Sequence, residues 1–381
     1  MENLYKDLFG AKKLGFGMMR LPMLKQADGT EAVDTEQVCR MVDEFLDRGF
    51  CYFDTAHGYL DGKSELAVRD CLTSRYPRVR YLLTDKLTSS FFKKEEDIRP
   101  LFESQLKACG VEYFDFYLLH SLTADNYDHY CRCHAFEAAQ QLKVEGLVRH
   151  VGFSFHDKPE LLRRILTEHP EVEVVQIQFN YADYEDPGVQ SRAVYEVCRE
   201  FNKPVIVMEP VKGGRLATLP PKAAEVLDGL QGGSAASYAV RFAASYEGVG
   251  MVLSGMSTTE QMEDNLSYMQ AFTPLNGAER AAVSQVCSLL LEQNLIACTN
   301  CRYCVAGCPK EILIPDLFAC LNAKKQYKDW NSDFYYEVNT NGHGKASDCI
   351  RCGQCEHVCP QHLPIRDLLV QAAKVFEKTE S

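Results

Sequence analysis

Short apolar segments alternate with longer amphipathic stretches between residues 13 and 256. Strand and helix patterns that alternate in this way predict parallel strands joined by right-handed helical crossovers. Eight such units in about 250 residues are the size of a closed (β/α)8 barrel, which is an α/β fold. The eight apolar segments that we expect to form the strands are residues 13–19, 51–56, 80–87, 114–121, 150–155, 172–180, 204–211 and 250–256.

An open doubly wound sheet is the competing architecture for the same pattern. That fold usually carries a glycine-rich phosphate turn between its first strand and the helix that follows. The segment GFGMMR, residues 15–20, has two glycines but no third glycine that opens a helix. We therefore expect the closed barrel over residues 1–275 and a connecting helix over residues 276–297.

The last part of the chain carries one cysteine pattern twice, C-x2-C-x2-C-x3-C followed by proline. Zinc sites also use C-x2-C pairs, but the two pairs are usually separated by a loop. Three closely spaced cysteines, a fourth three residues on and then a proline are typical of bacterial ferredoxins. The pattern therefore predicts two 4Fe-4S clusters. Their ligands are Cys298, Cys301, Cys304 and Cys308 in the first run and Cys349, Cys352, Cys355 and Cys359 in the second.

In two-cluster ferredoxins the fourth cysteine of each run ligates the other cluster. We therefore expect Cys359 to complete the cluster of the first run, and Cys308 to complete that of the second. The insert at residues 309–348 and the segment LPIRDLLVQAAKVFEK, residues 363–378, have apolar residues at helical spacing. Residues 298–381 are thus predicted to form a small, mainly helical ferredoxin-like domain.

Charge and composition narrow the classes of partner. The formal net charge is −12 and no basic run exceeds two residues, so a nucleic-acid partner is not expected. No apolar stretch reaches the roughly 18 residues of a membrane span, and the first residues, MENLYKDLFGAKKL, lack the apolar core of a secretory signal. With 17 cysteines and no such signal, we expect reduced thiols, a cytoplasmic location and no membrane association.

Polar side chains follow several predicted strands at their carboxyl ends. Each has an ordinary explanation, because aspartates cap helices, lysines extend along surfaces and histidines occur in cores. In a barrel, however, the carboxyl ends of all strands meet at one face, where active sites lie. Their joint position therefore indicates an active site built from Asp54, Tyr59, Lys86, His120, Ser154 and Gln176.

The segments that carry these residues resemble the aldo-keto reductases in order and spacing over roughly residues 10–275. The resemblance implies that Tyr59 is the proton donor, that Lys86 and Asp54 tune it, and that His120 orients a substrate carbonyl. It also implies a nicotinamide dinucleotide extended across the barrel mouth. The matching segments are FDTAHGY (53–59), KSE (63–65), LLTDKL (82–87), FDFYLLH (114–120) and LKVEGLVRHVGFS (142–154).

The residue types suit this chemistry independently. A phenol with a pKa near 10 is protonated at neutral pH but is a slow acid, and an ammonium within about 4 Å lowers its pKa. Asp54 is expected to keep Lys86 charged and oriented. A neutral His120 can donate a hydrogen bond to the carbonyl oxygen as charge develops there. His57 is the second candidate for this role, because loop histidines after strands are often only solvated.

The resemblance also implies residues that contact the dinucleotide. Ser154 and Gln176 match positions that hold the carboxamide, and EPVKGGRL, residues 209–216, matches the loop over the pyrophosphate. Met208 stands where many members place an aromatic ring. The segment SGMSTTEQMEDN, residues 254–265, lacks the basic residue that grips a 2′-phosphate, so NAD and NADP both remain open. The predicted contacts are Met18, Met19, Ser154, Gln176, Met208, Pro210, Val211, Gly213, Gly255, Ser257, Gln261 and Asn265, with Arg20 as a further candidate for cofactor or an anionic substrate.

These features support two classes of function. The first is an oxidoreductase that reduces a carbonyl or oxidises an alcohol with NAD or NADP and exchanges electrons through its clusters with a protein partner. Nicotinamide carries two electrons and each cluster carries one; a separately bound flavin would split the pair, although no flavin motif is visible. The second is a redox-sensing nucleotide-binding protein in which the clusters are sensory or structural.

Overall fold

The computed structural model describes residues 3–26, 29–186, 189–230, 232–292, 295–327 and 331–377. Eight parallel strands close into a barrel in the order β1-β10-β9-β8-β7-β6-β5-β4, which confirms the predicted fold class. Residues 293–294, 328–330 and 378–381 of the predicted connecting helix and C-terminal domain lie outside the described residues. The barrel strands are β1 Leu14–Gly17, β4 Tyr52–Asp54, β5 Leu82–Thr88, β6 Phe114–Leu122, β7 Val148–Phe155, β8 Val174–Gln178, β9 Val205–Met208 and β10 Val249–Ser254.

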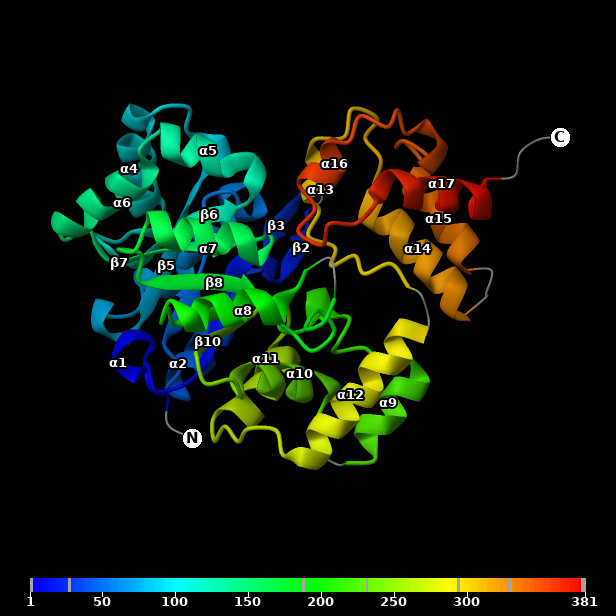
Figure 1. The fold of residues 1–381 in the computed structure, drawn as a ribbon, viewed down its shortest axis with the longest axis horizontal. Coiled ribbons are helices and arrows are strands. Elements are labelled where there is room, and N and C mark those ends of the chain that lie inside the picture. The colour runs from blue at the N-terminus through cyan, green and yellow to red at the C-terminus, as the bar shows by residue number, and fades with distance from the viewer. Residues whose placement is uncertain are drawn as a thin grey trace.

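Helices surround the barrel and connect its strands (Figure 1). An antiparallel hairpin of β2 (Met23–Lys25) and β3 (Glu31–Val33) also follows β1. The sequence pattern did not predict this hairpin, because three-residue strands are too short to show a period of two. The helices of this part are α1 Lys6–Phe9, α2 Thr35–Asp47, α3 Lys63–Val68, α4 Ile98–Cys109, α5 Ala124–Arg132, α6 Ala135–Val144, α7 Pro159–Glu168, α8 Ser191–Glu200, α9 Pro221–Asp228, α10 Ala235–Ala244 and α11 Thr259–Met269.

Side chains fill the inside of the barrel near the amino ends of its strands. Phe9 of α1 stacks on Phe116 of β6 with ring centroids 5.3 Å apart, and it meets Tyr52 of β4 edge to face. Burial of a large apolar side chain in this way stabilises the fold by about 1.5–3 kcal/mol. Since α1 closes the amino end, the carboxyl end is the open face on which a site can form.

Helix α12 (Gly277–Glu292) follows the barrel and packs beside α9. It is fastened to α10 by a buried ion pair in which the Arg241 guanidinium donates to both oxygens of Glu279, at 2.7 and 3.0 Å. Val283 and Val286 on α12 belong to the apolar core shared with the barrel helices. A helix is thus present within the predicted range 276–297, but it ends at Glu292 and residues 295–297 are not helical; it packs as part of the barrel's outer layer.

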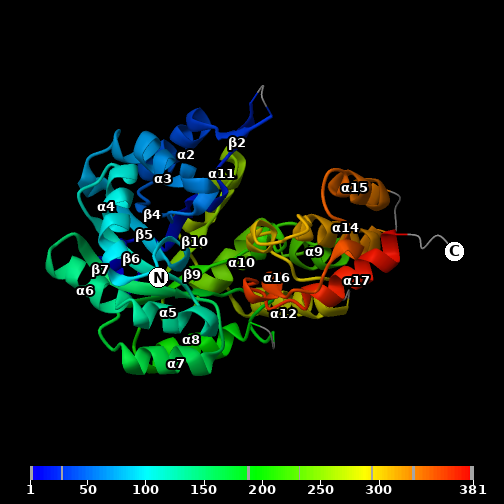
Figure 2. The same ribbon diagram turned by 90° about the horizontal axis from the view of Figure 1, so that it is seen from above.

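The cysteine-rich region forms a separate helical unit with its own apolar core, which includes Leu317, Phe318 and Leu369. Figures 1 and 2 show this unit beside the barrel, with α16 on the side that faces it and α15 and α17 farther out. The fold class predicted for this region is confirmed. Its helices are α13 Tyr303–Ala306, α14 Ile314–Tyr327, α15 Asn331–Thr340, α16 Gln354–His357 and α17 Ile365–Phe376.

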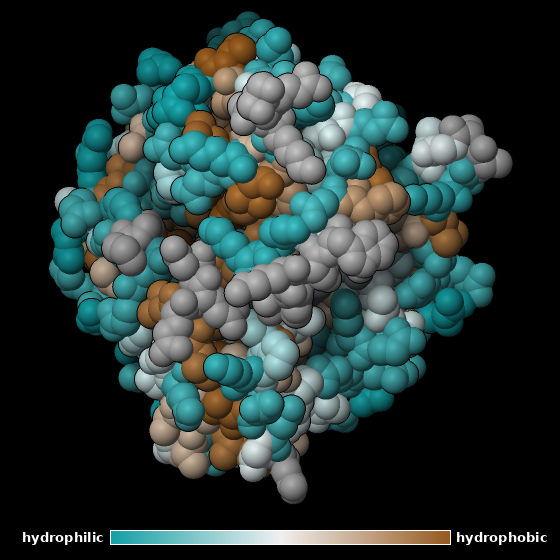
Figure 3. Space-filling model, turned by 90° about the vertical axis from the view of Figure 1, so that its right-hand side faces the viewer, coloured by the Kyte–Doolittle hydropathy of each residue, from teal (hydrophilic) through white to brown (hydrophobic). Residues whose placement is uncertain are grey.

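The face on the side of the C-terminal unit is mixed in character. Figure 3 shows hydrophilic residues around separated hydrophobic ones on this face. None of the helices in the described part of the chain is long and apolar enough to cross a membrane.

Candidate functional site

Three neighbouring strands bring the predicted catalytic residues together at the carboxyl end of the barrel. β4 pairs with β5, so Asp54 lies opposite Thr84, two residues before Lys86. β5 pairs with β6, so Thr88 lies opposite His120. This parallel register places residues that are far apart in the chain on adjacent strand ends, as the barrel prediction required.

The Lys86 ammonium is the centre of the site. It donates hydrogen bonds to the Asp54 carboxylate at 2.6 Å, to the Thr55 carbonyl at 2.7 Å and to the Tyr59 hydroxyl at 3.4 Å. The Lys86 side chain is fully buried. A buried ammonium requires such partners, because desolvation of an unpaired charge is costly. Asp54 therefore holds Lys86 in position, and the third hydrogen bond directs it at the Tyr59 oxygen.

Tyr59 begins a tight turn, Tyr59–Gly62, in which Leu60 and Asp61 have positive φ values of 53° and 55°. Although part of the ring is still accessible, burial raises the pKa of the phenol well above 10, and the nearby carboxylates of Asp54, Asp85 and Glu209 add to this. The sequence led us to expect a pKa lowered by Lys86. The structure instead raises this pKa, because burial and these carboxylates disfavour the phenolate. The phenol is protonated at neutral pH in either case.

His120 lies beside Tyr59, with the two rings edge to face and their centroids 5.7 Å apart. Burial first, then the positive charge of Lys86 and the neighbouring His156, hold the pKa of His120 well below 6.5. Its Nδ1 is 2.7 Å from the Thr88 hydroxyl, and either atom can be the donor. His120 is therefore neutral at physiological pH. When Thr88 donates, the other ring nitrogen, Nε2, carries a hydrogen that it can donate to a ligand.

His57, the second histidine candidate, is not merely solvated as we had expected. Its Nδ1 lies 3.0 Å from the Glu65 carboxylate, which raises the pKa of His57. Behind Glu65, the Asp85 carboxyl and the Cys109 thiol form a fully buried group with it. Burial and the Glu65 charge raise the pKa of Asp85 well above its usual range. The His57 ring is thus hydrogen-bonded to Glu65, and His120 is the histidine whose ring meets Tyr59 edge to face.

Two residues predicted to hold a carboxamide lie on the next strands. The Ser154 hydroxyl of β7 accepts a hydrogen bond from the Ser121 amide at 2.6 Å. The Gln176 amide of β8 donates to the second oxygen of Asp54 at 3.1 Å. Both residues are buried. Gln176 therefore joins the polar network of Asp54 and Lys86, and Ser154 lies opposite Gln176 on the neighbouring strand.

The loop after β9, predicted to cover a pyrophosphate, contacts the C-terminal unit. Gly213 has a φ of +62°, and a Cβ added there would lie 2.3 Å from the Thr299 carbonyl oxygen. A side chain at position 213 would therefore clash with the cysteine-rich region. The Gly213 amide lies close to the Glu209 carboxylate. One Glu209 oxygen lies 3.6 Å from the Arg20 guanidinium. The Gly213 amide and the Arg20 guanidinium, which could bind a phosphate, thus already contact Glu209 or Thr299.

The remaining predicted cofactor contacts lie near the first and last strands. Met18 and Met19 follow β1, and the Met18 carbonyl accepts a hydrogen bond from Ser64. Met208 ends β9, and Pro210 and Val211 follow it. After β10, the Gly255 backbone lies beside Arg20. The Ser257 amide donates to the Gln261 side chain at 2.8 Å, and the Asn265 amide group donates to the Gln261 carbonyl at 2.8 Å. Gln261 itself is exposed.

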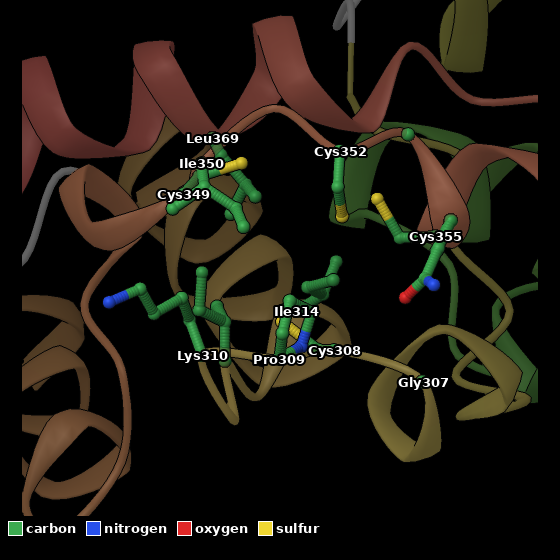
Figure 4. Close-up of a pocket in the computed structure, with 13 residues that line it drawn as sticks. Gly307, Cys308, Pro309, Lys310, Ile314, Cys349, Ile350, Cys352, Cys355 and Leu369 are labelled. Atoms are coloured by element: carbon green, nitrogen blue, oxygen red, sulfur yellow. The ribbon is translucent and has the colours of Figure 1, made fainter.

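The eight ferredoxin-type cysteines line two separate cavities. The first cavity is lined by Cys298, Cys301, Cys304 and Cys359, which we call the barrel-side set. The second cavity is lined by Cys308, Cys349, Cys352 and Cys355, which we call the outer set. Figure 4 shows the four cysteines of the outer set around a common space. Each set takes three cysteines from one run and the fourth from the other, which is the arrangement expected of a two-cluster ferredoxin.

The cysteine-rich region adds side chains to the barrel mouth that the sequence did not single out. Burial raises the pKa of the Tyr303 phenol well above 10, and the neighbouring Tyr59 and Cys301 add to this, whereas Lys86 lowers it. Gln361 accepts a hydrogen bond from Lys212 of the barrel at 2.9 Å. One signal was available in the sequence, since Tyr303 lies between the second and third cysteines of the first run.

Two family models match the chain. The model of the aldo/keto reductase family matches residues 13–286, and the model of a 4Fe-4S dicluster domain matches residues 297–363. Both families named from the sequence are thereby confirmed.

Individual relatives match the barrel part. The human aldo-keto reductase family 1 member C3 is 27% identical over 165 residues, which are 39% of this chain and 48% of that protein. This chain thus spans about half the length of that relative. The NADH-specific methylglyoxal reductase of Escherichia coli (strain K12) is 23% identical over 234 residues, 54% of this chain and 69% of that protein.

Solved structures share the barrel fold. The holo form of an aldo-keto reductase from Bacillus halodurans superposes with a TM-score of 0.58 and 24% identity, over 72% of this chain and 91% of that chain. An aldo-keto reductase from Klebsiella pneumoniae in complex with NADPH gives a TM-score of 0.58 and 20% identity, over 72% and 90% of the two chains. These likenesses concern the fold alone.

Proposed function

Because this chain belongs to the aldo/keto reductase family and carries a 4Fe-4S dicluster domain, we propose that it reduces a carbonyl compound, or oxidises the corresponding alcohol, with a nicotinamide dinucleotide. The observation that carries the proposal is the position of Lys86, whose ammonium contacts both the Asp54 carboxylate and the Tyr59 hydroxyl. This arrangement places one proton donor beside one fixed positive charge. The substrate is a small carbonyl or alcohol compound.

Each catalytic side chain has a defined task in this reaction. The bound nicotinamide supplies the hydride. Tyr59 donates its phenolic proton to the oxygen that becomes an alkoxide, and Lys86, 3.4 Å from that phenol, stabilises the phenolate left behind. The neutral His120 imidazole donates a hydrogen bond to the same substrate oxygen. Donors fixed in a buried site stabilise developing charge more effectively than donors in water.

The barrel mouth offers groups that suit the nicotinamide end of the dinucleotide. Gln176 presents an amide next to Asp54, and Ser154 presents a hydroxyl on the neighbouring strand; both types of group pair with a carboxamide. At the phosphate end, the Gly213 amide and Arg20 already contact Glu209 and Thr299. Binding of a pyrophosphate there would replace these partners. Arg20, Lys212 and the backbone of the 209–214 loop are the residues of this chain that would then hold it.

The residues expected to contact the adenosine end of the dinucleotide predict whether NADH or NADPH is preferred. Gln261 is exposed and is flanked by the exposed carboxylates of Glu260 and Glu263. A 2′-phosphate at this position would meet negative charge and gain no charge-assisted hydrogen bond. We therefore expect NADH to bind at least as tightly as NADPH, measured by calorimetry or by quenching of protein fluorescence under anaerobic conditions. A tenfold preference for NADPH would contradict the placement of the adenosine end at Gln261.

The two cysteine sets fit two 4Fe-4S clusters. Each cavity offers four sulfur ligands, the donor set that these clusters require. Such clusters transfer single electrons, so they connect the chain to a one-electron donor or acceptor, for which we propose an electron-transfer protein. Thr299 and Tyr303 lie between the cysteines of the barrel-side set and reach the barrel mouth. This proximity supports a redox function in which the cysteine-rich unit and the barrel act together.

A stoichiometric titration tests the proposed function. The protein is purified anaerobically, loaded with iron and sulfide, and titrated with NADH and with NADPH while electron paramagnetic resonance (EPR) follows the clusters. Oxidation of the dinucleotide by a carbonyl substrate would support carbonyl reduction. Appearance of reduced-cluster signals when the dinucleotide is added without a carbonyl substrate would support transfer of its two electrons to the clusters, one electron to each. If the dinucleotide binds but no added carbonyl compound oxidises it, the result would instead favour a redox-sensing nucleotide-binding protein.

A further inference from the structure

Three basic side chains of the barrel reach the loops that carry the barrel-side cysteine set. The Arg20 guanidinium donates to the Thr299 carbonyl at 3.1 Å, and the Lys212 ammonium donates to the Gln361 side chain at 2.9 Å. The Arg215 guanidinium donates to the Ile296 carbonyl. Each of these acceptors lies one or two residues from a cysteine of the set, Cys298 or Cys359. The barrel thus directs positive charge at one of the two cluster sites.

Two of the three charges are compensated by carboxylates. Lys212 forms a buried ion pair with Asp183. Arg20 lies 3.6 Å from the Glu209 carboxylate. Each of these pairs has little net charge, so its effect on a nearby group is small beyond a few ångströms.

Arg215 differs from the other two. Among the residues that the structure describes, no carboxylate forms an ion pair with it. Burial lowers the pKa of Arg215, while the neighbouring Cys298 and Asp183 act in the opposite direction. A desolvated guanidinium without a paired carboxylate is unfavourable unless other negative charge lies near it. The barrel-side cysteines supply this charge once they are thiolates bound to iron.

The outer set has a different electrostatic environment. The two sets differ in burial at one cysteine: each has one buried cysteine, but the outer set has the exposed Cys352 where the barrel-side set has only half-buried ones. Two nearby basic residues are paired with carboxylates on the surface, Arg351 with Asp367 at 2.9 Å and Arg366 with Glu356 at 2.6 Å. A third, Lys310, lines the outer cavity and is exposed to water. Water screens exposed charges and exposed ion pairs, so they change the reduction potential of a neighbouring cluster only weakly.

From this asymmetry we propose that Arg215 is the counter-ion of the barrel-side cluster and raises its reduction potential above that of the outer cluster. The physical reason is that a cluster with four thiolate ligands has a net negative charge, which grows by one on reduction. A fixed positive charge in a poorly solvated site stabilises the reduced form more than the oxidised form. Arg215 is a positioning residue, because it acts on the cluster and not on the substrate.

The inference rests on the proposed function only in requiring that both cysteine sets hold clusters. A potential is measured without substrate or dinucleotide, so its outcome is independent of carbonyl reduction. If no carbonyl substrate is found, the charge asymmetry can still be tested. If the potentials are unaffected by Arg215, the proposed reduction at Tyr59 still stands.

The test is an EPR-monitored redox titration of the loaded full-length chain and of Arg215→Gln. In the wild type we expect two potentials. In Arg215→Gln we expect one of them to become more negative by a shift equal to at least about a tenfold change in the reduction equilibrium, or about 59 mV for one electron. The other potential stays unchanged. The shifted signal should be the one that Cys359→Ser alters, since Cys359 belongs to the barrel-side set.

Two further variants separate charge from structure. Arg215→Lys keeps the positive charge, so it should retain most of the wild-type potential even though its hydrogen bond to Ile296 is altered. Arg302→Gln also removes one positive charge beside Cys301, but Arg302 is exposed and paired with Asp316, so we expect a smaller shift. The proposal is overturned if Arg215→Gln loads both clusters and leaves both potentials in place, or if Arg215→Lys lowers the potential as much as Arg215→Gln.

Discussion

The Tyr59→Phe variant is expected to reduce a carbonyl substrate at least about 100-fold more slowly than the wild type, the usual loss when a general acid is removed. Dinucleotide binding should be retained, because the ring and its contact with His120 remain. The missing hydroxyl accepts a hydrogen bond from Lys86, whereas the ring, whose centroid lies 4.8 Å from the Lys86 ammonium, is retained. Loss of the hydroxyl removes the proton source and leaves the positive charge in place.

Single-turnover measurements at saturating dinucleotide separate this effect from binding. Tyr303→Phe is the matched control, since Tyr303 is a second phenol close to Tyr59 but contributed by the cysteine-rich unit. We expect Tyr303→Phe to retain most of the turnover. Unchanged turnover in Tyr59→Phe would exclude Tyr59 as the acid, and a large loss confined to Tyr303→Phe would assign the proton to the other ring.

The same site predicts a simple pH dependence. The pKa of His120 lies well below 6.5 and that of Tyr59 well above 10. Neither group therefore changes its protonation state between these values, and the turnover limited by proton transfer should be level across that range. Protonation of His120 at lower pH would turn its imidazole into a cation.

The second large effect is expected from loss of one cluster ligand. In Cys359→Ala, the cluster bound by Cys298, Cys301 and Cys304 loses its fourth sulfur and should be lost or converted to a three-iron form. The reason is that Cys359 lines the cavity of these three cysteines, although it stands in the second run of the sequence. The outer cluster should keep all four of its ligands.

Anomalous diffraction, or EPR of the three-iron form, identifies the damaged site. The matched variant is Cys308→Ala, which should damage the cluster bound by Cys349, Cys352 and Cys355 in the same way. Damage at the outer cluster in Cys359→Ala would contradict exchange of the fourth cysteine between the runs. Because each cluster joins two runs of the chain, metal removal should also loosen the helices between them.

Much of the barrel followed from local patterns. The segments FDTAHGY and LLTDKL carry an apolar strand followed directly by polar residues, and the structure places β4 and β5 there. The short hairpin of β2 and β3 was missed because three-residue strands carry no measurable period. The cluster ligands could be identified from the sequence, because metal coordination restricts the spacing of cysteines along the chain more tightly than core packing restricts the choice of side chains.

The amino-acid sequence by itself determined the barrel, the two ferredoxin-type cysteine runs and the identity of the residues at the strand ends. Tertiary structure alone decided the surroundings of these residues. Burial raises the pKa of Tyr59 where Lys86 was expected to lower it, and Glu65 binds the ring of His57. Contacts such as that between Arg215 and Ile296 join segments separated by 81 residues. Local periodicity and ligand spacing are properties of neighbouring residues, whereas desolvation and charge pairing depend on which distant segments the fold brings together.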